Sequence, residues 1–151
     1  RPYMLLSLVL AYWESHRIDE ALQTGAEAID MEPDATTVLH FLFQGMGFAV
    51  QGNAAQAEQM LALVSRDGIA EPYHKLYDAA MKLTKLLATP PVSLPYGNAK
   101  RQLAGATAGI QAAAKEERVD AYFLHMARAA LAEHYGKSLS AKWQRLKTKF
   151  S

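Results

Sequence analysis

The stretch from Leu5 to Pro33, LLSLVLAYWESHRIDEALQTGAEAIDMEP, decides the predicted fold. Its first part has an apolar face whose members recur every three or four residues, namely Leu5, Leu8, Val9 and Tyr12. A short polar turn centred on His16 follows. A second apolar pattern then runs to Pro33, which ends it because proline disfavours helical geometry in the residue before it. The stretch therefore predicts two helices, over residues 3–15 and 18–31, folded back on each other.

The first of these helices carries a second apolar face, made by Leu6, Leu10 and Trp13. A helix that is apolar on two sides must be covered on two sides. We therefore expect this helix to be central in a bundle or to line a groove.

The rest of the chain repeats the helical pattern without any segment that predicts a strand. Apolar spacing, glycine stops and capping residues predict six further helices, over residues 36–51, 54–66, 71–88, 98–115, 119–135 and 138–149. Residues 89–97 contain three prolines and predict an extended loop. Short connections make neighbouring helices antiparallel, so we expect about eight helices grouped as four hairpins in one domain over residues 1–151.

An internal repeat links the first two hairpins. Tyr12 and Ala21 are nine residues apart, as are Phe48 and Ala57, and the two pairs are offset by 36 residues. This pattern resembles the tetratricopeptide repeat, a helix–turn–helix unit of about 34 residues. The residues that match it are Leu5, Leu8, Tyr12, Ala21, Ala28 and Pro33 in the first hairpin and Phe41, Gly45, Phe48, Gly52 and Ala57 in the second. The first hairpin departs from the pattern in carrying His16 at the turn glycine.

The resemblance implies an all-α fold of tetratricopeptide-like antiparallel hairpins stacked as a right-handed superhelix. Residues 3–33 and 36–68 would be regular repeats. Residues 71–115, which include the loop, would form a divergent hairpin, and residues 119–149 a divergent hairpin or cap.

The resemblance also implies a partner-binding groove, because such arrays bind partners on the concave face lined by the first helix of each hairpin. Carried over by spacing, this face consists of Tyr3, Leu6, Leu10, Trp13, Leu39, Leu42, Met46 and Ala49. The face is apolar, which favours a peptide or helix of a partner over the acidic tails that some family members clamp. The alternative is that later helices of the same chain fill the groove and make these residues ordinary core.

The sequence predicts no enzyme, metal site or cofactor. There is no cysteine, none of the five histidines pairs with another at a spacing of four, and no HExxH, phosphate-binding loop or nucleophile elbow is present. Adjacent carboxylates such as Asp19 and Glu20 lie at a helix start, where they favour the helix dipole. We therefore expect a non-enzymatic protein.

The charge of the chain is divided between its halves. Residues 1–68 carry three basic and nine acidic residues, a net charge of −6, and residues 69–151 carry thirteen and six, a net charge of +7. This polarity could steer a partner or a second copy of the chain. Within the basic half, the last helix places Trp143, Leu146 and Phe150 on one face among lysines and an arginine. We expect this helix to be a cap with a packed apolar face; the alternatives are docking onto nucleic acid, an anionic membrane or an acidic partner.

Together these observations predict a protein-interaction scaffold, part of a larger bacterial protein, that binds a protein or peptide partner through the groove. The alternatives are a self-assembly module, which would form a homo-oligomer, and a regulatory domain of a larger enzyme or transcription regulator. We do not expect nucleic acid as a partner. No apolar run is long enough to span a membrane and no signal peptide is visible, which favours the cytoplasm, although a chain that begins with Arg1 can have lost a targeting segment.

Overall fold

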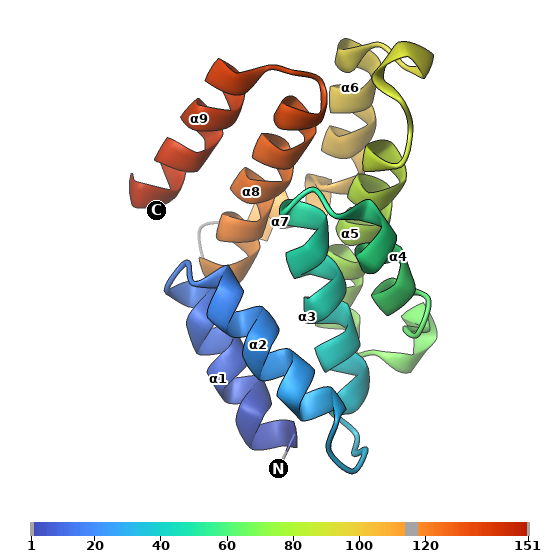
Figure 1. Cartoon of the computed structure of the whole chain (residues 1–151), viewed down its shortest axis with the longest axis vertical. Coiled ribbons are helices and arrows are strands. Elements are labelled where there is room, and N and C mark those ends of the chain that lie inside the picture. The colour runs from blue at the N-terminus through green and yellow to red at the C-terminus, as the bar shows by residue number, and fades with distance from the viewer. Residues whose placement is uncertain (1, 114–117, 151) are drawn as a thin grey trace.

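The protein is all-helical, as expected (Figure 1). The computed structural model describes the backbone of residues 2–113 and 118–150 and the side chains of residues 4–110 and 118–150. These residues form nine α-helices and no strand. The helices are α1 (Pro2–Glu14), α2 (Ile18–Ile29), α3 (Thr37–Val50), α4 (Ala54–Leu61), α5 (His74–Leu87), α6 (Tyr96–Ala106), α7 (Ala108–Ala113), α8 (Arg118–His134) and α9 (Ser138–Lys147).

The count differs from the expected eight because the helix predicted over residues 98–115 is divided at Thr107. This side chain is buried, and its hydroxyl donates a hydrogen bond of 2.8 Å to the carbonyl of Leu103, one turn earlier. Such bonds compete with the backbone ladder and bend helices. The division separates α6 from α7, while residues 114 and 115 of the predicted helix lie outside the described residues.

Three hairpins share one turn geometry. The turn residues His16, Gly52 and Gly136 have φ values of 62°, 81° and 71°, in the left-handed region. The next residue along donates its backbone N–H to the carbonyl five positions earlier, over 2.8 Å in α1–α2, 2.9 Å in α3–α4 and 2.8 Å in α8–α9. This is the bond that closes a helix in a Schellman motif. An alanine five positions after each turn residue (Ala21, Ala57 and Ala141) is buried, so the two helices of each hairpin approach closely.

The helix α8 packs across the first part of the chain. It contacts α1, α3 and α5 (Figure 1). The helix α2 packs against α1 and α3, and α4 packs against α3 and α5. An ion pair of 2.9 Å between Lys75 of α5 and the buried Asp120 of α8 adds to this contact. The helices α1, α3, α5 and α8 thereby share one hydrophobic core.

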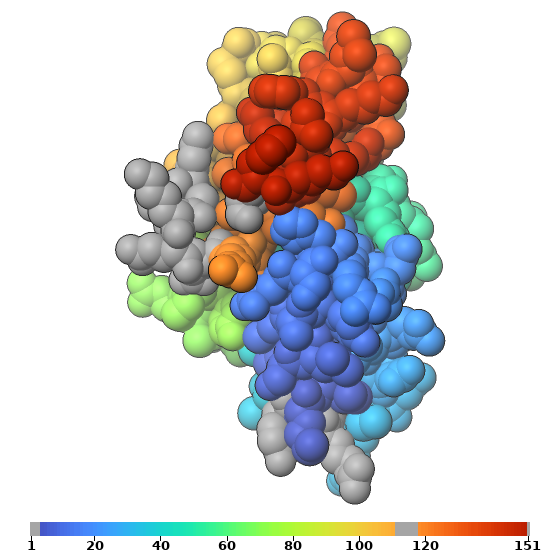
Figure 2. All heavy atoms as spheres, turned by 90° about the vertical axis from the view of Figure 1, so that its left-hand side faces the viewer, coloured from blue at the N-terminus to red at the C-terminus, as the bar shows by residue number. Residues whose placement is uncertain are grey.

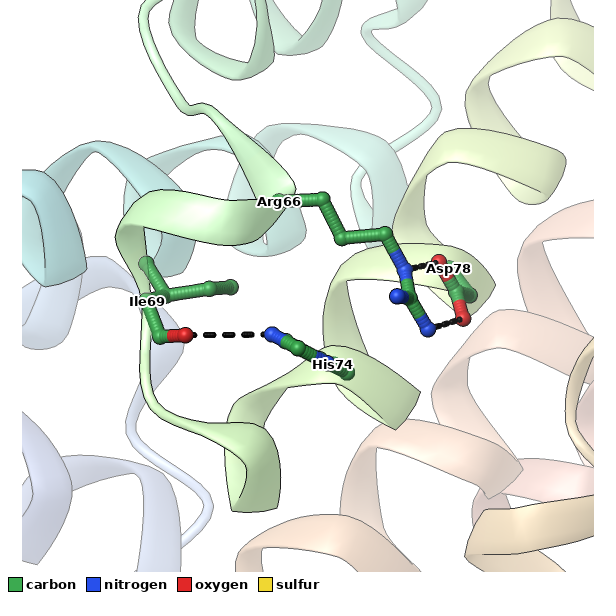
Figure 3. A network of polar contacts seen from close by, with 4 residues as sticks. All are labelled: Arg66, Ile69, His74 and Asp78. Atoms are coloured by element: carbon green, nitrogen blue, oxygen red, sulfur yellow. Dashed lines mark hydrogen bonds and ion pairs between the residues drawn. The ribbon is translucent and has the colours of Figure 1, made fainter.

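A polar network holds the connection between α4 and α5. Figure 3 shows Arg66 donating from Nε and Nη2 to the carboxylate of Asp78, each over 2.9 Å. In the same network, Nε2 of His74 lies 3.0 Å from the carbonyl oxygen of Ile69. The helix predicted over residues 54–66 therefore ends early, at Leu61, and the chain reaches α5 through two short 3-10 turns.

The shared turn leads to a prediction for glycine substitutions. Gly52→Ala is expected to lower the free energy of unfolding by about 1–2 kcal/mol, because an L residue is disfavoured at its positive φ. Gly105→Ala in α6 is the matched control: there φ is ordinary, and the change is expected to raise the same quantity by up to about 1 kcal/mol through helix propensity. An added Cβ meets no atom within 4 Å at either site, so only the backbone differs. Urea denaturation of both variants measures the two changes in the free energy of unfolding, which should have opposite signs. Equal changes would contradict the left-handed turn at Gly52.

Candidate functional site

The expected groove residues are largely core. Trp13, Leu42, Met46 and Ala49 are at most 1% exposed, and Leu6, Leu10 and Leu39 are half-buried. Tyr3 lies on α1, but its side chain is outside the described residues. The expectation of an open apolar groove therefore needs correction: in this structure the four buried residues are inaccessible to a partner.

The groove is filled by α8 of the same chain. The Trp13 ring lies 6.2 Å from that of Phe43 on α3, and 6.1 Å and 6.2 Å from those of Tyr122 and Phe123 on α8, measured between centroids. The two contacts with α8 are edge-on, an arrangement that stabilises aromatic clusters. Beside Leu10 a hollow of about 280 Å³ remains between α1, α3, α5 and α8. Of the two possibilities left open by the sequence, the structure shows the one in which the chain's own helix covers these residues.

The outermost helix, α9, presents its large apolar residues to solvent. The exposed residues, here named the α9 stripe, are Leu139, Trp143 and Leu146 of α9 and Phe150 of the 3-10 turn that follows it (Thr148–Phe150); they are 81%, 58%, 39% and 83% exposed. The expectation that this face is packed is wrong. The helix packs on α8 through the small Ala141 instead, because alanine lets two helices approach closely. Figure 2 shows α9 (red) at the surface above the α1–α2 hairpin (blue), with no described segment over it in that view.

A cavity of about 750 Å³ adjoins the stripe, here named the α6–α9 cavity. One side is formed by α6, with Tyr96, and the other by α9, with Leu139 and Trp143. Leu131 of α8 lines it between these two sides, and Leu103 of α6 also contributes to its lining. The volume is in the range of protein sites that bind ligands. The cavity joins part of an exposed apolar stripe to a recess between three helices.

The lining of the cavity is positively charged. Lys100 and Arg101 of α6 and Arg128 of α8 contribute to it, and none of its described lining residues is acidic. The Lys100 ammonium also lies over the Tyr96 ring, 4.8 Å from its centroid. Arg128 is half-buried, and this burial lowers the pKa of its guanidinium below the usual value.

The neighbouring His125 on α8 is half-buried. Burial, and after it the charge of Arg128, lowers the pKa of this ring below its usual value. The ring is therefore neutral at neutral pH, and Arg128 is the charged group at this point of α8.

Two further properties concern the described residues alone. They contain no group of three or more metal-ligating side chains near enough to share an ion. None of their helices combines the length and the apolar character needed to cross a membrane.

The sequence contained part of the signal for this site. The spacing of Trp143, Leu146 and Phe150 predicts one apolar face, and Leu139 extends that face by one turn. The direction of the face was not predictable, because it depends on which side of α9 meets α8. The cationic residues of α6 and α8 lie 27 or more positions apart in the sequence, so no local pattern joins them.

Comparison of the chain with family models, with curated proteins and with solved structures gives no match.

Proposed function

We propose that this chain is a non-enzymatic protein-interaction scaffold, built as a tetratricopeptide-like, right-handed superhelical stack of hairpins. The shared turn of α1–α2, α3–α4 and α8–α9 supports the repeat, since each has a left-handed turn residue and a buried alanine five positions later. The apolar face of α1 and α3 is consistent with such a stack, because α8 covers it in the position where a partner's helix would bind to an open array.

The α9 stripe is the observation that carries this proposal. An amphipathic helix in an isolated domain normally turns its large apolar residues inward. Here Leu139, Trp143 and Leu146 occupy positions i, i+4 and i+7 of α9, Phe150 follows in the next 3-10 turn, and all four side chains are exposed. A group of large exposed apolar residues on one segment is typical of an interaction site. The partner therefore meets α9, and the filled groove of α1 and α3 serves to hold the stack together.

The proposal is tested by selecting helical peptides from a displayed library against the intact chain. Trp143→Glu is expected to weaken binding of the enriched peptides by about tenfold or more, because interface tryptophans commonly contribute over 1.4 kcal/mol. The substitution should leave the melting temperature nearly unchanged, since the side chain is already solvated.

Leu63→Glu is the matched control, because Leu63 is as exposed as Trp143, at 57%, and lies after α4 rather than on α9. It should leave peptide binding unchanged. Equal binding by wild type and Trp143→Glu, or a selection that enriches no peptide, would contradict the proposal.

A further inference from the structure

We propose, as an extension that rests on the interaction function above, that the α6–α9 cavity binds an acidic amphipathic helix of a partner protein. The partner's apolar side chains would lie between Tyr96 and Trp143, and its carboxylates would pair with Arg128, Lys100 and Arg101.

The shape of the site suits a helix. Two helices, α6 and α9, form its sides, and α8 contributes Leu131 between them. Helices that dock in such grooves insert apolar residues spaced three or four apart. On the α9 side, Leu139 and Trp143 have the same spacing, so they can pack along one face of an incoming helix.

Arg128 indicates the charge of the partner. Three other arginines of the chain each pair with a carboxylate: Arg17 with Glu20, Arg66 with Asp78, and Arg145 with Glu133. Arg128 has no ion pair or hydrogen bond among the described residues, although it is half-buried. Removing a guanidinium from water without a counter-charge is unfavourable, and a carboxylate offsets that cost with two parallel hydrogen bonds.

The surrounding charges favour the same partner. Lys100 and Arg101 line the cavity with exposed side chains, and the half of the chain that contains it carries a net charge of +7. These groups would attract an acidic segment at long range, and their effect would fall with added salt. The positive charges therefore favour a negatively charged partner, and the apolar walls favour a partner that also has an apolar face.

The recessed position of Arg128 favours a helix over two other anionic surfaces. A lipid headgroup layer would meet the protruding α9 stripe, but it is planar and does not enter a cavity between helices. Nucleic acid would meet the exposed lysines, but its phosphates gain nothing from the apolar stripe. A helix with both apolar and acidic faces uses every feature of the site.

The test uses three synthetic peptides with one leucine and phenylalanine stripe, flanked by glutamate, glutamine or lysine. Calorimetry with the intact chain at low salt should show the glutamate peptide binding about tenfold or more tightly than the glutamine peptide, with the lysine peptide weakest. Arg128→Gln should remove about tenfold from the affinity for the glutamate peptide and leave the glutamine peptide unaffected. Arg118→Gln, on the same helix and outside the cavity lining, is the matched control and should change neither affinity.

A second variant tests the positive charge of the site while leaving the half-buried Arg128 in place, so a folding defect caused by replacing Arg128 does not affect it. Lys100→Gln with Arg101→Gln alters exposed side chains only, and it should reduce binding of the glutamate peptide several-fold. Equal binding of the glutamate and glutamine peptides, both lost in Trp143→Glu, would overturn the acidic partner while leaving the scaffold function standing.

Two other outcomes would also overturn the acidic partner helix. One is binding to phosphatidylserine vesicles that is tighter than binding to the glutamate peptide and insensitive to Arg128→Gln, which would assign the stripe to a membrane. The other is self-association in sedimentation at low salt that Arg128→Gln abolishes, which would assign the cavity to the acidic half of a second copy.

Discussion

Replacing Trp13 with alanine is expected to lower the free energy of unfolding by about 3–5 kcal/mol. The side chain is 1% exposed, and its ring contacts aromatic rings of α3 and α8. Truncation would remove a large buried area and leave a cavity where α1, α3 and α8 meet. Natural domains have a total stability of about 5–15 kcal/mol, so the variant would lose a large part of it.

The chain provides its own control for this experiment. Trp143→Ala makes the same chemical change at a side chain that is 58% exposed, and it should shift the free energy of unfolding by no more than about 0.5 kcal/mol. Urea denaturation followed by far-ultraviolet circular dichroism measures both. Similar destabilisation by the two variants would mean that α8 does not cover Trp13 in solution.

The two tryptophans also show how far the sequence predicts this fold. Helical spacing identified both as members of apolar faces, and the first hairpin, its buried Ala21 and the all-α class followed from local patterns. Spacing does not say what covers a face. Trp13 is covered by α8, about 110 positions later, and Trp143 is left outside because Ala141 takes the contact with α8. Both outcomes depend on which distant helix packs against each face, and the pattern of a single helix does not show this.

The turn at His16 illustrates a second limit. The sequence marks His16 as a departure from the glycine of the repeat pattern, yet its backbone adopts the same left-handed conformation as Gly52 and Gly136. Its ring stacks on Tyr122 of α8, with centroids 4.1 Å apart and planes 6° from parallel. Stacking of about 0.5–1.5 kcal/mol is comparable with the cost of the left-handed conformation, about 1–2 kcal/mol. A tertiary contact thus offsets a local preference, which no local pattern could reveal.

Met46→Glu is the second substitution expected to have a large effect, and it tests the filled groove directly. Met46 is 0% exposed on α3, so a glutamate there must be buried. Full burial raises the pKa of a carboxyl group by about 3–5 units, so the folded chain must keep this group protonated at pH 7, where an unfolded glutamate, with a pKa of about 4.3, is ionised. Holding that proton costs about 4 kcal/mol of stability at pH 7. We expect the variant to be largely unfolded at neutral pH and to regain part of its helicity as the pH falls toward 5, because the cost of keeping the buried carboxyl protonated shrinks as the pH approaches the pKa of the unfolded glutamate.

Met4→Glu is the matched control, because Met4 is 61% exposed on α1 and a charge there remains in water. Its melting temperature should stay within a few degrees of wild type. The contrast bears on function as well, because loss of partner binding in Met46→Glu would report unfolding and not a docking residue. A Met46→Glu chain as stable as Met4→Glu would mean instead that α8 leaves its place readily. The face of α1 and α3 would then be open to a partner helix, and the docking site would move there from α9.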